Sequence, residues 1–311
     1  MRIGIDMMGG DYAPQEAVKG VLQYLQSSSP VVPLTLIGDE QPVRSLFQDI
    51  PEILRFVHAP EIIGMNEHAT RALKEKPESS IAKGFKLLAA GEIDAFVSAG
   101  NTGAMMVGTF YNIKSIEGVL RPTISTLMPQ INGGYSLILD VGLNADCKAE
   151  NLFQFAVLGS LYAQHILKIE DPRVALLNIG EEEGKGNLLA QAAYPLLKAS
   201  PQIHFIGNIE GRDILTGKAD VMVTEGFTGN VLLKMAESLY DVATHRGFGE
   251  DEYFQRFHYE NYGGTPILGV SKPVIIGHGI SGAAAFRNMI VLAQKMLESD
   301  LLSKMKASFV I

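Results

Sequence analysis

Two short polar turns in the sequence contain residue types that bind phosphate. The first is Ser98-Ala99-Gly100-Asn101-Thr102-Gly103, between two apolar runs, and the second is Gly226-Phe227-Thr228-Gly229-Asn230. Glycine lets the backbone approach a ligand closely. A strand that ends in such a turn and opens into a helix presents free N–H groups at the positive end of the helix dipole. Proteins hold phosphate in this way, so the two turns predict an anion site assembled from both halves of the chain.

The segments around these turns predict an α/β protein. Short apolar runs of β type, such as 2–7, 93–98 and 220–223, alternate with helix-type segments such as 14–26 and 281–298. This alternation predicts a large, mostly parallel sheet with helices on both faces.

The chain is long for one hydrophobic core. Its 311 residues exceed the size at which a single core usually stops growing, and no interdomain linker is visible. We therefore expect residues 1–311 to form a single α/β unit with two interwoven subdomains. Residues 240–262 are rich in aromatic and charged side chains and interrupt the alternation, which predicts a helical excursion from the sheet.

Small and polar residues follow most of the predicted strands. Ligands of α/β sheets bind beyond the carboxyl ends of the strands. Each of these residues, taken singly, is better explained as a turn residue or helix cap, but their common position at one edge indicates a site. They are Asp6, Gly9, Gly10, Asp11, Ser98, Asn101, Thr102, Asp140, Asn144, Asn178, Glu181, Lys185, Asn208, Glu210, Glu225, Thr228, Asn230, His278 and Ser281.

Four of these residues have competing interpretations. Asp6 and Asp11 bracket a Met-Met-Gly-Gly turn, which suits a metal site and a structural turn about equally, and we favour no metal. His278, between two glycines, suits a general acid or base, but a histidine held by backbone bonds is slightly favoured. Lys185, also between two glycines, brings a cation to a strand end, and a functional role is favoured over a solvated lysine.

Several other classes of function are disfavoured. The single cysteine, Cys147, lacks a protease-like neighbourhood and is expected to be inert. No G-x-G-x-x-G fingerprint follows the first strand, which argues against a standard dinucleotide site. The net charge of −8 argues against a nucleic-acid partner. The lone cysteine, the N-terminus without signal-peptide architecture and the lack of an apolar run of about 18 residues predict a cytoplasmic protein.

A series of motifs covers nearly the whole chain in a fixed order. They are Asp6–Pro14, Ser98–Gly103, Asp140–Asn144, Asn178–Glu181 with Lys185-Gly186, Gly226–Asn230, Tyr262–Pro266 and His278-Gly279. Together they resemble the PlsX family, the bacterial phosphate acyltransferases. The resemblance implies that inorganic phosphate attacks the thioester of a long-chain acyl-[acyl carrier protein], giving acyl phosphate and free carrier protein for phospholipid synthesis.

The resemblance also implies a fold and an assembly. It implies a three-layer α/β/α sandwich like that of isocitrate and isopropylmalate dehydrogenases and of phosphotransacetylase, a homodimer, and no metal or organic cofactor. Because phosphate would itself be the nucleophile, the lack of a protein nucleophile fits this chemistry. Catalysis would then need phosphate oriented against the carbonyl and donors for the developing oxyanion.

The resemblance gives roles to the polar residues at the sheet edge. Lys185 and Asn230 are expected to supply charge or donors at the reacting centre, with Asp6 and His278 as further catalytic residues. The expected phosphate-binding residues are Gly9, Gly10, Asp11, Ser98, Asn101, Thr102, Gly103, Asn178, Glu181, Thr228 and Gly229.

The sequence departs from the family pattern at two places. Residues 231–260 are shorter than the helical excursion of the family, whose apolar tip helps to bind membrane. The aromatic residues left there suit a peripheral membrane contact, although a core or dimer-interface position is favoured; they are Phe248, Tyr253, Phe254 and Phe257. Glu225 stands where an aspartate usually precedes the Gly-Phe-Thr-Gly-Asn run.

Three rival functions are weighed against this one. They are a short-chain phosphotransacetylase that uses coenzyme A, a dehydrogenase of related fold, and a non-catalytic scaffold that recruits lipid-synthesis enzymes through residues 240–262. A basic stretch containing Arg71, Lys74, Lys76 and Lys83 is the expected docking face for the carrier protein, although such runs are more often solvated surface.

Overall fold

The computed structural model describes residues 1–27 and 30–309 and divides into two compact units. The first unit comprises Met1–Ser115 with Tyr259–Glu298, and the second comprises Ile116–His258 with the residues from Ser299 onward. Each unit is therefore built from two separate stretches of chain, and each has its own strands and helices.

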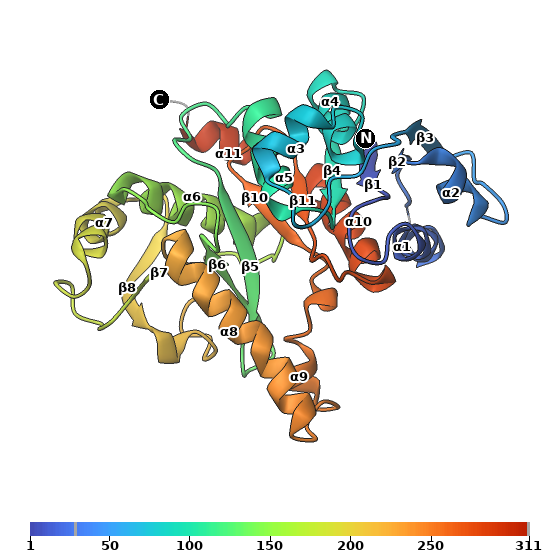
Figure 1. Cartoon of the computed structure of the whole chain (residues 1–311). Helices are drawn as coiled ribbons and strands as arrows, with labels where there is room; N and C mark the ends of the chain where they lie inside the picture. Colours follow the sequence, from blue (N-terminus) through green and yellow to red (C-terminus); the bar gives the residue numbers. More distant parts are fainter. Residues whose placement is uncertain (28–29, 310–311) are drawn as a thin grey trace. The chain divides into compact units, whose positions relative to one another are not determined.

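The first unit contains a mostly parallel sheet with the strand order β3-β2-β1-β4-β11-β10 (Figure 1). Strands β3, β2, β1, β4 and β11 pair in parallel, and β10 pairs antiparallel with β11. The strands are β1 (Ile3–Asp6), β2 (Leu34–Gly38), β3 (Leu54–His58), β4 (Ala95–Ser98), β10 (Thr265–Leu268) and β11 (Val274–Ile276). The central strands β1 and β4 are buried along their whole length, because helices cover both faces of the sheet.

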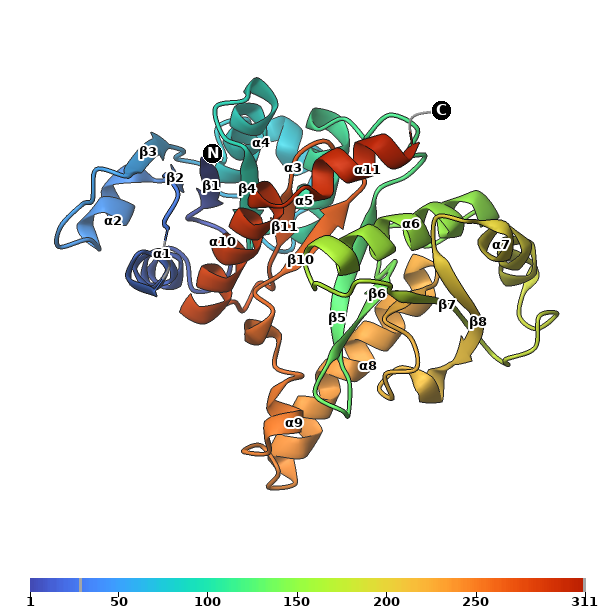
Figure 2. The same cartoon turned by 180° about the vertical axis from the view of Figure 1, so that it is seen from behind.

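Two groups of helices cover this sheet. Helices α1 (Gln15–Ser27) and α10 (Ala283–Glu298) pack together on one side, and α3 (Ala69–Glu75), α4 (Ser80–Ala90) and α5 (Thr102–Asn112) lie on the other (Figures 1 and 2). The short helix α2 (Glu40–Ser45) packs against β3.

Helix α4 has a capping residue at each end. The Ser79 hydroxyl accepts a hydrogen bond of 3.3 Å from the Ala82 N–H, and Gly91 ends the helix in the left-handed region.

The second unit contains a sheet with the order β5-β6-β9-β7-β8. Strands β5 and β6 pair antiparallel, whereas β6 with β9, β9 with β7 and β7 with β8 pair in parallel. The strands are β5 (Thr123–Pro129), β6 (Tyr135–Leu139), β7 (Arg173–Asn178), β8 (His204–Glu210) and β9 (Val221–Val223). Helices α6 (Ala149–His165), α7 (Leu188–Ala199) and α11 (Leu301–Phe309) lie on one side, and α8 (Gly226–His245) lies on the other (Figures 1 and 2).

The predicted α/β class is confirmed, and both polar turns lie between a strand and a helix. Ser98–Gly103 joins β4 to α5, and Gly226–Asn230 follows β9 as the first turn of α8. The segment predicted as a helical excursion, 240–262, contains the end of α8, which continues through His245, and the short helix α9 (Glu252–Gln255). Strands β5 and β10 are additions to the predicted elements.

Candidate active site

A buried carboxylate organises the polar turns of the first unit. Asp6, at the end of β1, is fully buried, and its Oδ2 accepts a hydrogen bond of 2.6 Å from the hydroxyl of Ser98 at the end of β4. The Met8 N–H donates to Oδ1 at 2.9 Å, and Ser80 also donates to the carboxylate. Burial raises the pKa of Asp6, and these hydrogen bonds partly oppose that shift. Asp6 thus joins the ends of two neighbouring strands to the start of α4.

The glycine turn after β1 lies directly against the turn after β4. A Cβ atom at Gly9 would lie 2.6 Å from the backbone nitrogen of Gly100, and Gly10 has a φ of +102°. Only glycine is comfortable in both situations. The Asp11 N–H donates to the Gly279 carbonyl at 2.7 Å, so the loop after β11, which carries His278, also lies here. The fold of the first unit therefore brings together five of the predicted site residues: Gly9, Gly10, Asp11, Ser98 and His278.

The side chain of Asn101 is occupied by contacts within the protein. Its Oδ1 accepts the Ala104 N–H at 2.9 Å, which caps α5. Its Nδ2 donates to the carbonyls of Gly64, Met65 and Glu67 at 2.9, 3.1 and 3.0 Å. The Asn101 amide therefore shapes the turn and fastens the loop between β3 and α3 onto it.

Two backbone donors at the start of α5 remain open. Within the described part of the chain, the N–H groups of Thr102 and Gly103 have no hydrogen-bond acceptor. The first N–H groups of a helix have no partner inside it, and the cap is a neutral amide. This helix end can therefore accept an anion. By contrast, at the start of α10 the N–H groups of Gly282 and Ala283 donate to the carboxylates of Glu260 and Glu16 at 2.9 and 3.0 Å.

The turn at the start of α8, in the second unit, is capped by a carboxylate. Glu225 accepts hydrogen bonds from the N–H of Phe227 at 2.6 Å and of Thr228 at 3.1 Å, and the Thr228 hydroxyl also donates to it. A negative charge already stabilises this helix end. Thr228 is therefore placed at a strand-to-helix turn, as predicted, but its donors are used within the turn.

A second buried carboxylate, Asp140, holds the loop after β6. It accepts the N–H of Ile124 at 3.0 Å and the N–H and side-chain amide of Asn144 at 2.6 and 2.9 Å. Burial raises its pKa, against these hydrogen bonds. Gly229 contacts the Asp140 carbonyl so closely that a Cβ would clash with it. Beside it, the Asn230 amide donates to the Val141 carbonyl at 3.1 Å.

The loop between β7 and α7 carries the predicted cation. The Lys185 ammonium is about half exposed and lies 4.0 Å from the Glu182 carboxylate. Asn178 braces the loop, since its Nδ2 donates to the Lys185 carbonyl at 3.0 Å. Glu181 forms an ion pair of 2.5 Å with Lys218. Lys185 thus remains accessible, whereas Glu181 is engaged elsewhere.

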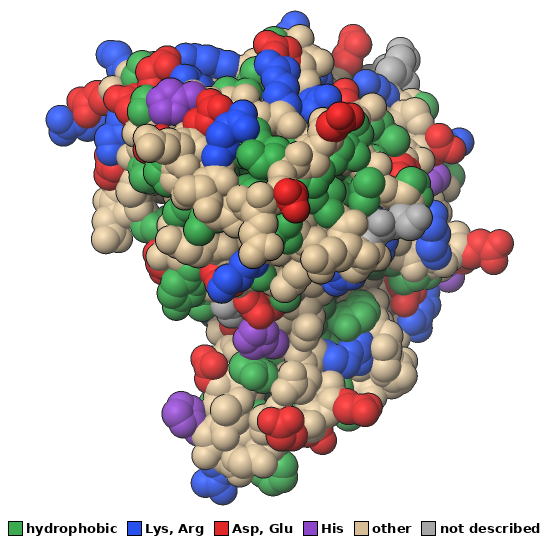
Figure 3. Space-filling view, turned by 90° about the vertical axis from the view of Figure 1, so that its right-hand side faces the viewer, with side chains coloured by type: hydrophobic (Ala, Val, Ile, Leu, Met, Phe, Trp, Pro, Cys, Tyr) green, Lys and Arg blue, Asp and Glu red, His purple; other side chains and the backbone are tan. Residues whose placement is uncertain are grey.

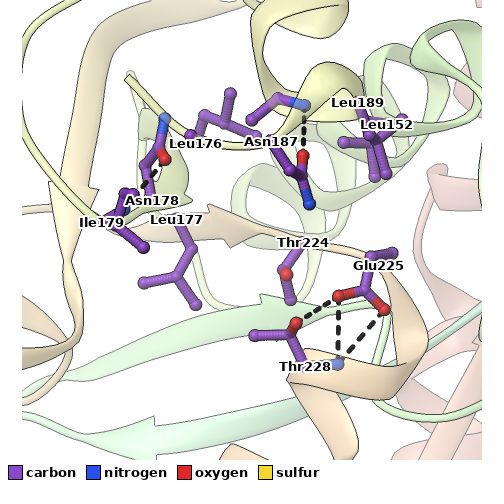
Figure 4. A pocket seen from close by; sticks show the side chains of 12 residues that line it. Leu152, Leu176, Leu177, Asn178, Ile179, Asn187, Leu189, Thr224, Glu225 and Thr228 are labelled. Atoms are coloured by element: carbon purple, nitrogen blue, oxygen red, sulfur yellow. Dashed lines mark hydrogen bonds between the residues drawn. The ribbon is translucent and has the colours of Figure 1, made fainter.

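A pocket of about 270 Å³ opens at the carboxyl ends of β7 and β9 (Figure 4). Most of its accessible lining is apolar, and Thr228 and Glu225 stand along one side. The lining comes from α6, β7, α7 and the start of α8: Leu152, Leu176, Leu177, Asn178, Ile179, Gly186, Asn187, Leu189, Ala190, Thr224, Glu225 and Thr228. The apolar members are not predictable from the sequence, because only tertiary packing brings together leucines from three separate segments.

Three further observations bear on the chemistry. Burial raises the pKa of the Cys147 thiol to about 12, so this cysteine is a poor nucleophile. Among residues 1–27 and 30–309, no three His, Cys, Asp or Glu side chains form a group that could hold a metal ion. None of the described helices is long and apolar enough to cross a membrane.

Comparisons with known proteins agree with the pattern of motifs. The sequence model of a family described as fatty acid synthesis protein matches residues 1–245. The phosphate acyltransferase of Dictyoglomus turgidum is 43% identical over 325 residues, which cover 98% of this chain and 96% of that protein. The chain belongs to the phosphate acyltransferase family. A second member, from Chlorobaculum tepidum, is 45% identical over 94% of this chain and 96% of its own length.

Solved structures support the fold expected for this family. A phosphotransacetylase from Streptococcus pyogenes has a TM-score of 0.64 at 20% identity and covers 96% of this chain and 94% of its own. A branched-chain phosphotransacylase from Enterococcus faecalis has the same TM-score at 14% identity, covering 96% of this chain and all of its own. The predicted phosphotransacetylase-like fold is confirmed. The chain is therefore a transferase of this family with that fold.

Proposed function

We propose that the protein transfers the acyl group of a long-chain acyl-[acyl carrier protein] to inorganic phosphate, for phospholipid synthesis. Membership of the phosphate acyltransferase family is the observation that carries this proposal. The open N–H groups at the start of α5 supply a place for the nucleophile. The names of the relatives do not specify the acyl donor, and the carrier protein is our assignment.

We assign phosphate to the turn at the start of α5. The backbone donors of Thr102 and Gly103 are open there, and the neutral Asn101 cap adds no competing charge. The sequence predicts phosphate at this turn and at the turn that contains Thr228. The carboxylate of Glu225 makes the second turn a poor anion site, because a bound phosphate would face it directly.

The reaction needs no protein nucleophile. A phosphate oxygen attacks the thioester carbonyl, the carbon–sulfur bond breaks, and the proton of hydrogen phosphate passes to the leaving thiolate. Hydrogen-bond donors that stabilise the oxyanion lower the barrier. We assign this electrostatic role to the exposed Lys185 ammonium and to the Asn230 amide. Asp6 acts as a positioning residue, because its buried carboxylate is fully engaged by the turns around it.

We also propose a docking face for the carrier protein on α3 and α4. Residues 69–90 carry five Lys or Arg and two Glu, a local net charge of +3 in a chain of net charge −8. Two expected docking cations, Arg71 and Lys83, are paired with Glu75 at 2.8 Å and Glu78 at 2.6 Å. Lys74 has no hydrogen bond or ion pair within the described residues, so it is the cation most available to an acidic partner.

The positive charge of α3 and α4 distinguishes this surface, because positive and negative side chains are mixed on other parts of the protein surface. On the face drawn in Figure 3, Lys and Arg side chains are interleaved with Asp and Glu side chains. In the first unit, Arg44 pairs with Glu40 at 2.6 Å and Arg55 pairs with Glu92 at 2.8 Å, so these charges neutralise each other. A surface of one sign favours encounter with a partner of the opposite sign.

A homodimer and a peripheral membrane contact belong to the same proposal. Helix α8 exposes an apolar stripe at Val231, Met235 and Val242, which suits contact with a second copy. Phe248, at the tip after α8, is 59% exposed and suits a membrane surface, whereas Phe257 is buried. Sedimentation equilibrium tests the dimer, and co-sedimentation with anionic liposomes tests the membrane contact.

The proposed reaction is tested by phosphate-dependent release of free carrier protein from palmitoyl-[acyl carrier protein]. We expect release and acyl phosphate in equal amounts, with far lower activity on palmitoyl-coenzyme A. A preference for short-chain acyl-coenzyme A would identify the rival phosphotransacetylase activity. A folded protein that releases no carrier protein would support the non-catalytic scaffold.

A further inference from the structure

We propose that the pocket at the carboxyl ends of β7 and β9 binds the hydrocarbon chain of the acyl substrate. The proposal deepens the proposed function and rests on it. Leu176 and Leu177 of β7, Leu189 and Ala190 of α7 and Leu152 of α6 form its aliphatic lining, and the volume is about 270 Å³ (Figure 4).

The polar members of the lining have their main hydrogen bonds within the protein. Asn178 donates to the Lys185 carbonyl at 3.0 Å and accepts the Ile179 N–H at 2.8 Å. The Oδ1 of Asn187 accepts the Ala190 N–H at 2.9 Å. The Thr228 hydroxyl donates to Glu225. Because these polar groups already have hydrogen-bond partners in the protein, the pocket favours an apolar ligand over a polar head group.

Charge at the pocket excludes an anionic occupant. Glu225 places a carboxylate on the lining and compensates the positive end of α8. A phosphate or carboxylate in this pocket would meet like charge. A hydrocarbon chain has no such conflict and gains from leaving water.

The approach to the pocket is unusually apolar for a surface. Ile179, which lines the pocket, is 82% exposed. Leu188 and Phe227, each next to a lining residue in the chain, are 86% and 68% exposed. Exposed apolar side chains grouped around a pocket are typical of a site that receives an apolar ligand. An acyl chain thus has an apolar path into the pocket.

Binding can be measured without catalysis, because the chain has no tryptophan. An Ile179→Trp variant reports on the pocket, and an Ala192→Trp variant, on the exposed side of α7, is the matched control. Titration with alkyl phosphates of increasing chain length should shift the emission only at position 179. Affinity should rise about fourfold per added methylene until the pocket is full.

Several results would overturn the proposal. Equal emission changes at both tryptophan positions would show that the alkyl phosphates bind non-specifically. A response to inorganic phosphate alone would make the pocket an anion site, and a response to pantetheine but not to alkyl phosphates would make it a site for the carrier's arm. A shift that depends only on protein concentration would mean that a second copy covers the pocket.

Chain-length selectivity gives the second test. Ala190→Phe fills the pocket and should move the optimum of kcat/KM to shorter acyl chains, whereas Leu189→Ala enlarges it and should move the optimum to longer ones. Ala192→Phe controls for added bulk on α7. An unchanged optimum in both pocket variants, with folded protein, would refute the proposal. If the native protein forms no acyl phosphate, the proposed function fails, while the tryptophan titration still decides about the pocket.

Discussion

The carboxylate of Glu225 accepts hydrogen bonds from both the backbone N–H and the hydroxyl of Thr228 in the first turn of α8. The corresponding turn of α5 is capped by the neutral amide of Asn101. The two turns have similar sequences and similar positions after a strand, yet only one leaves donors open to an anion. Similar glycine-rich turns can therefore differ in the backbone donors that they leave open because of one capping side chain.

The first prediction concerns the capping carboxylate. Glu225→Ala should lower the free energy of unfolding by about 1–2 kcal/mol, because the variant loses the α8 cap. Thr228→Val should leave the KM for phosphate within about twofold of the native value, since the lost hydroxyl donates to Glu225. Urea unfolding and phosphate titrations measure the two effects. A tenfold higher KM for phosphate in Thr228→Val would show that phosphate binds at this turn.

The second prediction isolates one backbone donor. Thr102 is the first residue of α5, where proline is well tolerated, and Asn101 before it has an extended ψ of 109°. Thr102→Pro should keep the fold and raise the KM for phosphate at least tenfold, because it removes an N–H that we assign to phosphate. Thr102→Ala keeps the N–H and is the control. Equal KM values for phosphate in the two variants would show that the α5 turn does not bind phosphate.

The third prediction tests the assigned electrostatic groups. Lys185→Ala and Asn230→Ala should each lower kcat by about 100- to 1,000-fold. Lys198→Ala removes a lysine of the same unit that is paired with Glu183 at 2.8 Å, and it should retain turnover. Circular dichroism and thermal unfolding check that the variants are folded, since Asn230 also bonds the Val141 carbonyl. Turnover near normal in both alanine variants would exclude these roles.

The fourth prediction follows from the pKa of Cys147. A thiol whose pKa rises from 9.0 to about 12 has little thiolate at pH 8, because the pH lies far below the pKa. Alkylation by iodoacetamide in the native protein should therefore be about 1,000-fold slower than that of a free cysteine. Unfolding in urea should restore the rate, and Cys147→Ser should retain activity. Rapid alkylation with loss of turnover would indicate that Cys147 acts as a nucleophile.

The fifth prediction concerns carrier-protein docking. Lys74→Glu should raise the KM for the acyl carrier substrate several-fold, and the effect should shrink as salt is added. Arg71→Glu is the matched comparison, and it should have a smaller effect because Arg71 is already paired with Glu75 at 2.8 Å. The KM for acyl-coenzyme A should be the same in both variants, because this small substrate does not need the docking face. An unchanged KM for Lys74→Glu would exclude this docking face.

Local sequence signals were sufficient for most of the elements. The caps of α4 and α5, at Ser79 and Asn101, follow from short-range hydrogen-bonding preferences, and the glycine after α4 follows from its left-handed backbone. Strand β10 was missed because Pro266, its second residue, is unfavourable within a strand. Its place in the sheet depends on pairing with β11 rather than on its own propensity.

The positions of the site residues were predictable from the sequence, but their hydrogen-bond partners were not. Sequence position correctly placed Asp6, Ser98 and the Gly9–Gly10 turn at the same strand ends. It could not predict that Asn101 would donate to three carbonyls of the loop at 64–67, or that Glu181 would pair with Lys218. Those partners are distant in sequence, so only the folded chain determines which polar groups are left for a ligand.

The two-segment construction of the first unit has a consequence for synthesis on the ribosome. Strand β4 is buried in the middle of its sheet, and its neighbour β11 pairs with it through Val97 and Ile275. The ribosome makes β11 only after the whole segment Ile116–His258 has been made. Until then β4 has an unpaired apolar edge, a feature that promotes aggregation. The nascent chain therefore lacks the partner strand of this edge throughout the elongation of Ile116–His258.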